Sequence, residues 1–429
     1  MTIDRPITHD TPLAQVARLC LSAGRLMLLT GANGRMVHEA ISEIAGALGC
    51  DTVEVFCQHA AILVTIHRGE HSFIQMNKAP EHGVNLRRTQ AVQQIIRDLS
   101  AGRLDCACAQ AAIDRIPETT AAYPVWFVCL CTGLACGAFG RLLGADWQSF
   151  LPIIVASAGG QWLRHTLLHQ RHNIFVVAGV ISFVSATLAG FGARLCGSTH
   201  ASIATVAAVL LLVPGVAVLN AQVDILEGKP NLAAARALRV LYLLMFMALG
   251  LALAQTLVIH AASTGTPPAP MLDTSLFHIF HQALFGGLAA VGFAVLFNCH
   301  PRMLPACFGA GAFALAVRTI GQDQGASLAV ASFFAALLLA IVNKIWQDFP
   351  SPRGSVLAVV GVIPMVPGSL AARVFISVFG FLRSGQSEGV AATVATWDNL
   401  MMLIFTLAAI GTGLALPSLI PVARISEEG

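Results

Sequence analysis

Two apolar segments of this chain are each interrupted by a Pro-Gly pair, and these breaks constrain the fold more than any other feature. The first is Pro214-Gly215, within residues 211–226, and the second is Pro367-Gly368, within residues 357–377. Proline removes a backbone donor and clashes with the preceding turn, so a membrane helix broken there must satisfy the freed carbonyls with other groups. Paired breaks of this kind point to a transporter binding site, and we expect both to line a cavity.

Composition indicates a polytopic membrane protein with a soluble N-terminal part. Of 429 residues, 56% are hydrophobic and 11% are charged, against roughly 25% charged in an ordinary soluble domain. Eleven of the 25 Lys and Arg precede residue 120, and the net charge of +3 gives no argument for nucleic-acid binding. The first residues carry acids and no apolar signal-peptide core, so we expect the N-terminus to stay in the cytoplasm.

Eleven cysteines are spread over the chain without a CxxC pair, so we interpret them as small core residues. We expect no metal site and no cofactor.

Residues 1–120 are predicted to form a cytoplasmic α+β domain. Helical periodicity over residues 11–49 indicates two helices joined by a Gly-Ala-Asn-Gly turn at Gly31 to Gly34. The rest of the predicted domain is three short strands in a meander, then two more helices: 52–58, 61–66, 72–76, 86–100 and 104–116.

About ten membrane spans follow, in two halves of five, 121–262 and 263–429, joined by a Pro-rich connector at 261–275. The predicted spans are 125–143, 147–163, 174–192, 201–222, 237–258, 276–298, 303–319, 326–343, 355–380 and 395–417. Because five is odd, the second half enters from the opposite side, and homologous halves would form an inverted repeat suited to alternating access.

The distribution of Lys and Arg between loops predicts that both termini are cytoplasmic. Nine predicted inner positions are basic: Arg164, Arg171, Lys229, Arg236, Arg239, Arg302, Lys344, Arg353 and Arg424. Four predicted outer positions are basic: Arg141, Arg194, Arg318 and Arg383.

The predicted substrate site lies at the two breaks. The half-helices that begin at Pro214-Gly215 and Pro367-Gly368 present unpaired N–H groups and positive dipole ends, which favour a carboxylate. Five residues after each glycine stand Asn220 and Arg373. We expect Arg373 to bind a carboxylate with two parallel bonds and Asn220 to bind the polar remainder of the substrate. The alternatives are a structural kink, an Arg373 that pairs with a helix carbonyl or acid or extends toward the outer membrane surface, and an Asn220 in interhelical contact.

Two acids are candidates for ion coupling. Asp224 follows Gly215 by nine residues, and Asp398 lies at the outer end of the last span beside Trp397. For Asp224 the alternative is ordinary pairing with Arg236 or Arg239. The Gly31 to Gly34 turn before a helix is typical of anion binding, but it has no preceding strand and no Lys-Ser/Thr, so it is a weak nucleotide signal. Nothing in the sequence indicates catalysis.

These residues resemble those of the threonine/serine exporter family. The resemblance rests on Leu26 to Ile66, LMLLTGANGRMVHEAISEIAGALGCDTVEVFCQHAAILVTI, on a fourth-span signature and on a C-terminal module with Pro364 and Pro367-Gly368. The signature consists of Pro214-Gly215, Asn220, Asp224, Gly228 and Arg236. This chain is similar to the fused, two-module form.

The resemblance implies export of threonine and serine linked to the proton-motive force, while two-subunit relatives are associated with succinate-like dicarboxylates. The chain departs from the family after the turn, where Asn33 to His38 replaces an Arg-Val-Glu-like triplet. The roles of that triplet are therefore not assigned to Arg35 and Glu39. For the soluble domain, the resemblance implies only a role in gating or regulation.

We therefore predict a bacterial inner-membrane secondary exporter, not an enzyme, that moves L-threonine and L-serine by proton antiport. A dicarboxylate exporter and a passive channel for small organic anions are the alternatives. Its partners are the small substrate, protons and the lipid bilayer, without nucleic acid, and the oligomeric state is left open.

Overall fold

The computed structural model describes residues 11–58, 60–79, 83–260, 276–347, 354–371, 373–374, 377 and 390–419. It divides into two compact units. The N-terminal unit holds residues up to Tyr123 together with Val216–Arg239 and Phe297–His300, and the helical unit holds Pro124–Gly215, Val240–Leu296 and the chain from Pro301. The predicted connector at 261–275 and part of the predicted ninth span lie outside the described residues, as do Arg353, Arg383 and Arg424.

In the N-terminal unit, the predicted meander is confirmed as a three-stranded antiparallel sheet in the order β1-β2-β3. The strands are β1 (Thr52–Cys57), β2 (Ala61–Arg68) and β3 (His71–Lys78), the last two joined by a turn with Gly69 at φ 58°. The register pairs Val55 with Val64 and Val64 with Gln75. Apolar alternation on β2 buries Ile62, Val64 and Ile66 on one face.

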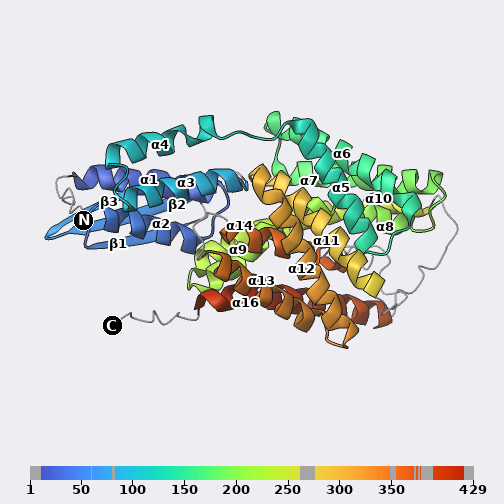
Figure 1. Ribbon diagram of the computed structural model, residues 1–429. Helices are drawn as coiled ribbons and strands as arrows, with labels where there is room; N and C mark the ends of the chain where they lie inside the picture. Colours follow the sequence, from blue (N-terminus) through green and yellow to red (C-terminus); the bar gives the residue numbers. More distant parts are fainter. Residues whose placement is uncertain are drawn as a thin grey trace. The chain divides into compact units, whose positions relative to one another are not determined.

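Four helices complete the N-terminal domain, at the blue end of the colour scale in Figure 1. They are α1 (Leu13–Leu29), α2 (Gly34–Ala47), α3 (Leu86–Ser100) and α4 (Cys106–Thr119). The helices α1 and α2 pack against the sheet, and α3 and α4 pack against α1. Side chains of Asn33, Asn85 and Asp105 accept the backbone N–H three residues later, which explains where α2, α3 and α4 begin.

From Val125 onward, a series of three long helices followed by a short helix and a 3₁₀ turn occurs twice in the described chain. The first set is α5 (Val125–Leu142), α6 (Trp147–His169), α7 (Ile174–Leu195), α8 (Ala201–Ala207), η1 (Leu210–Leu212), α9 (Gly215–Leu226) and α10 (Pro230–His260). The second is α11 (Leu276–Leu296), η2 (Pro301–Met303), α12 (Leu304–Asp323), α13 (Leu328–Gln347), α14 (Gly354–Val362), η3 (Ile363–Met365) and α16 (Val390–Leu419). In each set the fourth predicted span is broken, and α9 and the start of α10 belong to the N-terminal unit.

Seven helices of the described chain are long and apolar enough to cross a membrane, namely α5, α7, α10, α11, α12 (with the short η2), α13 and α16. Exposed Leu241, Met245, Leu249 and Leu253 lie at helical spacing along α10. An apolar stripe facing outward is the surface that lipid covers. The protein is therefore a multi-pass membrane protein, and the arrangement of ten spans as an inverted repeat stays a prediction.

Small residues let the membrane helices approach closely. A Cβ on Gly133 of α5 would lie 2.6 Å from the Ile154 carbonyl oxygen of α6, and one on Gly250 of α10 would lie 2.2 Å from the Gly179 carbonyl oxygen of α7. Such small-residue contacts are characteristic of helix packing in lipid, where no hydrophobic effect draws helices together.

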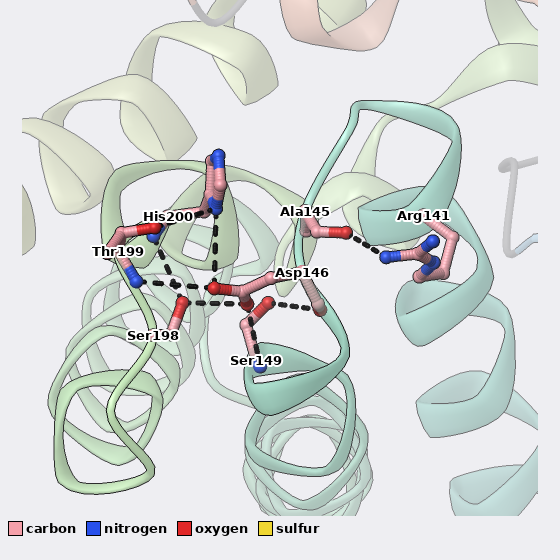
Figure 2. Close-up of polar contacts among 7 residues, drawn as sticks. All are labelled: Arg141, Ala145, Asp146, Ser149, Ser198, Thr199 and His200. Atoms are coloured by element: carbon pink, nitrogen blue, oxygen red, sulfur yellow. Dashed lines mark hydrogen bonds and ion pairs between the residues drawn. The ribbon is translucent and has the colours of Figure 1, made fainter. Parts of the chain in front are cut away.

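A polar cluster around Asp146 connects two turns of the helical unit, and Figure 2 shows its members converging on one carboxylate. Asp146 begins α6 by accepting the Ser149 N–H at 3.0 Å, and it also accepts the Ser198 hydroxyl at 2.8 Å and the Thr199 N–H at 3.2 Å. His200 Nδ1 lies 3.3 Å away, so the turn before α6 is tied to the turn before α8. Burial by itself would raise the pKa of Asp146, but the hydrogen bonds from Ser149, Ser198 and His200 outweigh it and lower the pKa to about 2.

Candidate functional site

The two Pro-Gly breaks adopt the same backbone form. A single 3₁₀ turn, η1 or η3, precedes an extended valine, then the proline, and a helix starts at the glycine. Val213 has φ −62° and ψ 125°, and Val366 has φ −60° and ψ 122°. The extended backbone follows from the residue's position before proline, which disfavours the helical region.

The breaks also contact each other reciprocally within the helical unit. A Cβ on Gly215 would lie 3.3 Å from Ile363 Cγ2, and a Cβ on Gly368 would lie 3.1 Å from Val213 Cγ2 and 3.3 Å from Leu210 Cδ2. Gly368 follows Gly215 by 153 positions, and Ile363 follows Leu210 by the same interval. Contacts that exchange partners in this way are those expected across a two-fold axis.

A cavity of about 290 Å³ opens at these breaks in the helical unit. Its lining includes Gly215, Pro367, Gly368 and Arg373, four of the predicted site residues. Polar side chains in the lining are Gln282, Arg318, Gln322, Ser369 and Arg373. Among the described residues that line it, none carries a carboxylate, so the side chains facing the cavity are cationic or neutral.

Arg318 also lines the cavity, although the sequence predicted only that it lies at an outer helix end. It lies in the last part of α12, half-buried, and donates from Nη1 to the Met365 carbonyl oxygen at 3.2 Å. That carbonyl belongs to η3, just before the second break, so the freed backbone group finds a cationic donor. Like Arg373, Arg318 is an arginine within an apolar segment, and that signal could have identified it.

The other four predicted residues are not among those that line the cavity, and of these Pro214 is half-buried and directly precedes the lining residue Gly215. The Asn220 amide donates to the Gly31 carbonyl oxygen at 2.8 Å within the N-terminal unit. Asp224 is 0% exposed and pairs with Arg236 at 2.5 Å, the pairing given as its alternative. Asp398 is exposed on α16.

The turn from Gly31 to Gly34 binds an anion of this same chain. Asp224 Oδ1 accepts the Gly34 N–H at 2.8 Å, at the first residue of α2. The N-terminus of a helix favours negative charge, and here a carboxylate 190 positions away supplies it.

A cavity at paired helix breaks, within a set of helices that can span a bilayer, is the arrangement of a membrane transporter. The family description "Putative threonine/serine exporter" matches residues 18–258, and the description "Threonine/Serine exporter, ThrE" matches residues 282–420. The chain therefore belongs to the threonine/serine exporter family, as the resemblance in its sequence predicts.

The chain is also similar to curated bacterial proteins. A protein of Klebsiella aerogenes named "Probable succinate transporter subunit YjjP" is 31% identical over 223 residues, covering 52% of this chain and 85% of the relative. Its namesake in Escherichia coli strain K12 is 31% identical over 226 residues, covering 52% and 86%. An uncharacterized protein of Haemophilus influenzae is 20% identical over 405 residues, covering 94% and 95%. No solved structure matches the chain at a significant level.

Proposed function

We propose that this chain is a proton-coupled secondary exporter of small polar carboxylates in a bacterial inner membrane, with L-threonine and L-serine as substrates and both termini in the cytoplasm. The observation that carries the proposal is the cavity at the two breaks, where Arg318 and Arg373 stand among neutral polar groups. Guanidinium groups bind carboxylates through paired, charge-assisted hydrogen bonds.

The same proposal includes an inverted repeat of ten spans. Its support is the run of three long helices, a short helix and a 3₁₀ turn that precedes each break, and the reciprocal contacts of Gly215 and Gly368 at one sequence interval. In such a repeat, alternating access arises when one half rocks against the other around a fixed site. Asp398 and Asp224 remain the proposed coupling acids, and Asp224 would have to leave Arg236 to take that role.

A dicarboxylate is the second candidate substrate, and the charge of the cavity favours it. An amino acid brings an ammonium group, which is best bound by an acid, whereas the described lining offers two arginines and no carboxylate. Two relatives are also named as succinate transporter subunits.

Counterflow in proteoliposomes with labelled threonine, serine and succinate tests the proposal. We expect Arg373→Ala and Arg318→Ala each to lower transport by about 10- to 100-fold, because each removes a charge-assisted hydrogen bond of about 1.5 to 3 kcal/mol. Arg194→Ala is the matched control, since Arg194 ends α7 and does not line the cavity. Full transport in both cavity variants would remove this site from the mechanism.

Collapse of the proton gradient separates the exporter from the passive channel. An exporter coupled to protons stops uphill transport when the gradient is lost, while a channel continues downhill flux unchanged.

A further inference from the structure

Two segments of the N-terminal unit lead directly into membrane helices of different halves of the chain. Val216–Arg239 contains most of α9 and the start of α10, and Phe297–His300 connects α11 to η2 and α12. Both are bound by the N-terminal domain of residues up to Tyr123. We call them the α9–α10 segment and the α11–α12 segment.

The α9–α10 segment is held by a buried ionic contact. Asp224 receives the Gly34 N–H and the Arg236 guanidinium, and Arg236 Nη2 donates to the Ala32 carbonyl oxygen at 3.0 Å. Asp224 and Arg236 are 0% and 2% exposed, so water is excluded from both charges. Asn220 adds its bond to the Gly31 carbonyl oxygen. The turn that joins α1 to α2 is therefore bonded at Gly31, Ala32 and Gly34 to α9 and α10.

A half-exposed ion pair flanks this contact. Arg35 Nη1 lies 3.1 Å from Glu227 Oε1, and Arg35 Nε lies 2.6 Å from Glu39 Oε1. The side chains of Arg35 and Glu227 are 32% and 25% exposed, so reagents in water can reach residues placed there.

The α11–α12 segment is held through its backbone. The Leu86 N–H donates to the Phe297 carbonyl oxygen at 2.9 Å, and Arg87 donates to the Cys299 carbonyl oxygen at 3.3 Å. Asn298, at φ 52°, donates its amide to Asn85 Oδ1 at 3.2 Å and to the Ala121 carbonyl oxygen at 3.1 Å. The start of α3 is thus bonded to the connection between two membrane helices of the second half.

We propose that the N-terminal domain is a releasable brace, which holds the α9–α10 and α11–α12 segments in one transport state and must release both of them in each cycle. The inference rests on the proposed function, because alternating access moves one half against the other. One folded domain is bonded to a connection in each half, so a movement of either connection away from the domain must break those bonds.

The chemistry of the first contact suits release better than permanent attachment. A buried ion pair contributes less to a permanent contact than apolar residues of the same size, because both charges must be desolvated. When the pair separates, Asp224 and Arg236 regain water, whereas an apolar contact would be left exposed. The brace would also occupy Asn220 and Asp224, two residues of the predicted site, in the held state only.

Reversible cross-linking of the full chain in proteoliposomes tests the brace at both segments. One variant carries Asn85→Cys with Asn298→Cys, and the other carries Arg35→Cys with Glu227→Cys. Each is treated with a short bifunctional methanethiosulfonate, which forms a disulfide at each end and is removed by dithiothreitol. Cys108 and Cys196 are exposed, so both are first changed to serine in every variant.

We expect cross-linking of either pair to lower counterflow at least tenfold and dithiothreitol to restore it. The single-cysteine variants, treated in the same way, should keep their transport. The two pairs are independent, so a variant that fails to fold at one segment leaves the test intact at the other.

Unchanged transport in either cross-linked variant would overturn the brace alone, because a permanent attachment tolerates a covalent bond between residues already in contact. Absence of transport in the parent and in the reduced variants, for all three substrates, would instead overturn the proposed function and the brace with it.

Discussion

Asp146 and Asp224 are both aspartates that satisfy a helix N-terminus and connect parts of the chain distant in sequence, yet they do so with different chemistry. Asp146 is bound by hydroxyl, backbone N–H and imidazole groups and remains partly open to solvent, with its side chain 18% exposed. Asp224 is sealed from solvent and balanced by one arginine and one backbone N–H. The difference is that the Asp146 carboxylate shares several hydrogen-bond donors, so the loss of one leaves the others, whereas the buried Asp224–Arg236 pair depends on both charges being present.

Of the substitutions at the two aspartates, removal of the Asp224 charge should cause the largest loss of unfolding free energy. Asp224→Asn leaves Arg236 buried without its acid, and we expect the free energy of unfolding of the detergent-solubilised protein to fall by about 3 to 5 kcal/mol. Denaturant titration measures this change. The double variant Asp224→Leu with Arg236→Met should recover most of the loss, since no lone charge remains buried. If the single variant is as stable as the parent, the Asp224–Arg236 pair does not contribute to the free energy of unfolding of the protein.

Acidification should act on Asp146 through its lowered pKa. The pKa of Asp146 falls from 3.8 to about 2 on folding, so its ionised form contributes about 2.5 kcal/mol to stability above about pH 4. That contribution should be lost as pH falls from about 4 to about 2. Asp146→Asn removes the titrating group, so the difference in unfolding free energy between parent and variant should shrink over the same window. A difference that stays constant from pH 5 to pH 2 would contradict the hydrogen-bonded carboxylate.

A methyl group at the α2 N-terminus should weaken the Asp224 contact without touching a charge. A Cβ on Gly34 would lie 2.8 Å from Lys229 Cδ and 3.1 Å from Asp224 Oδ1. We expect Gly34→Ala to cost about 1 to 2 kcal/mol, because these side chains must shift. Gly46→Ala in the same helix is the control: nothing lies within 4 Å of its Cβ, and it should stabilise by about 0.5 to 1 kcal/mol. Equal thermal stability of the two variants would show that the carboxylate does not need the space at Gly34.

The smallest effect belongs to a single neutral donor at Asp146. Ser198→Ala removes one hydroxyl hydrogen bond of 2.8 Å, and three other donors remain on the carboxylate. The expected loss of unfolding free energy is about 1 kcal/mol, measured by thermal unfolding. A loss as large as that of Asp224→Asn would remove the contrast between the two aspartates.

The sequence predicted the elements of this protein well because their signals are local. Alternation of apolar residues located β1 to β3, and apolar length with proline and glycine located the membrane helices and both breaks. The capping role of Asp146 was also within reach, since an aspartate three residues before Ser149 precedes an apolar helix.

The candidate site was predicted in part. Gly215, Pro367, Gly368 and Arg373 line one cavity. The signal for them was the Pro-Gly break, which can be recognised within each apolar segment separately. Arg318 was assigned to a helix end, because counting charges in loops does not show how far a helix continues. Asn220 was predicted to bind substrate, and its amide donates to a turn 189 positions away.

By itself, the sequence determined that the chain crosses a membrane, carries a small α+β domain at its start and breaks two helices at matched positions. These features depend on hydrophobicity, backbone sterics and spacing, which neighbouring residues decide. Only the tertiary structure decided that the two breaks contact each other, that Arg318 joins the cavity, and that Asp224 binds the start of α2. Each of these contacts joins residues that are far apart in the sequence and become buried together on folding. Which residues meet in this way depends on how the folded elements pack.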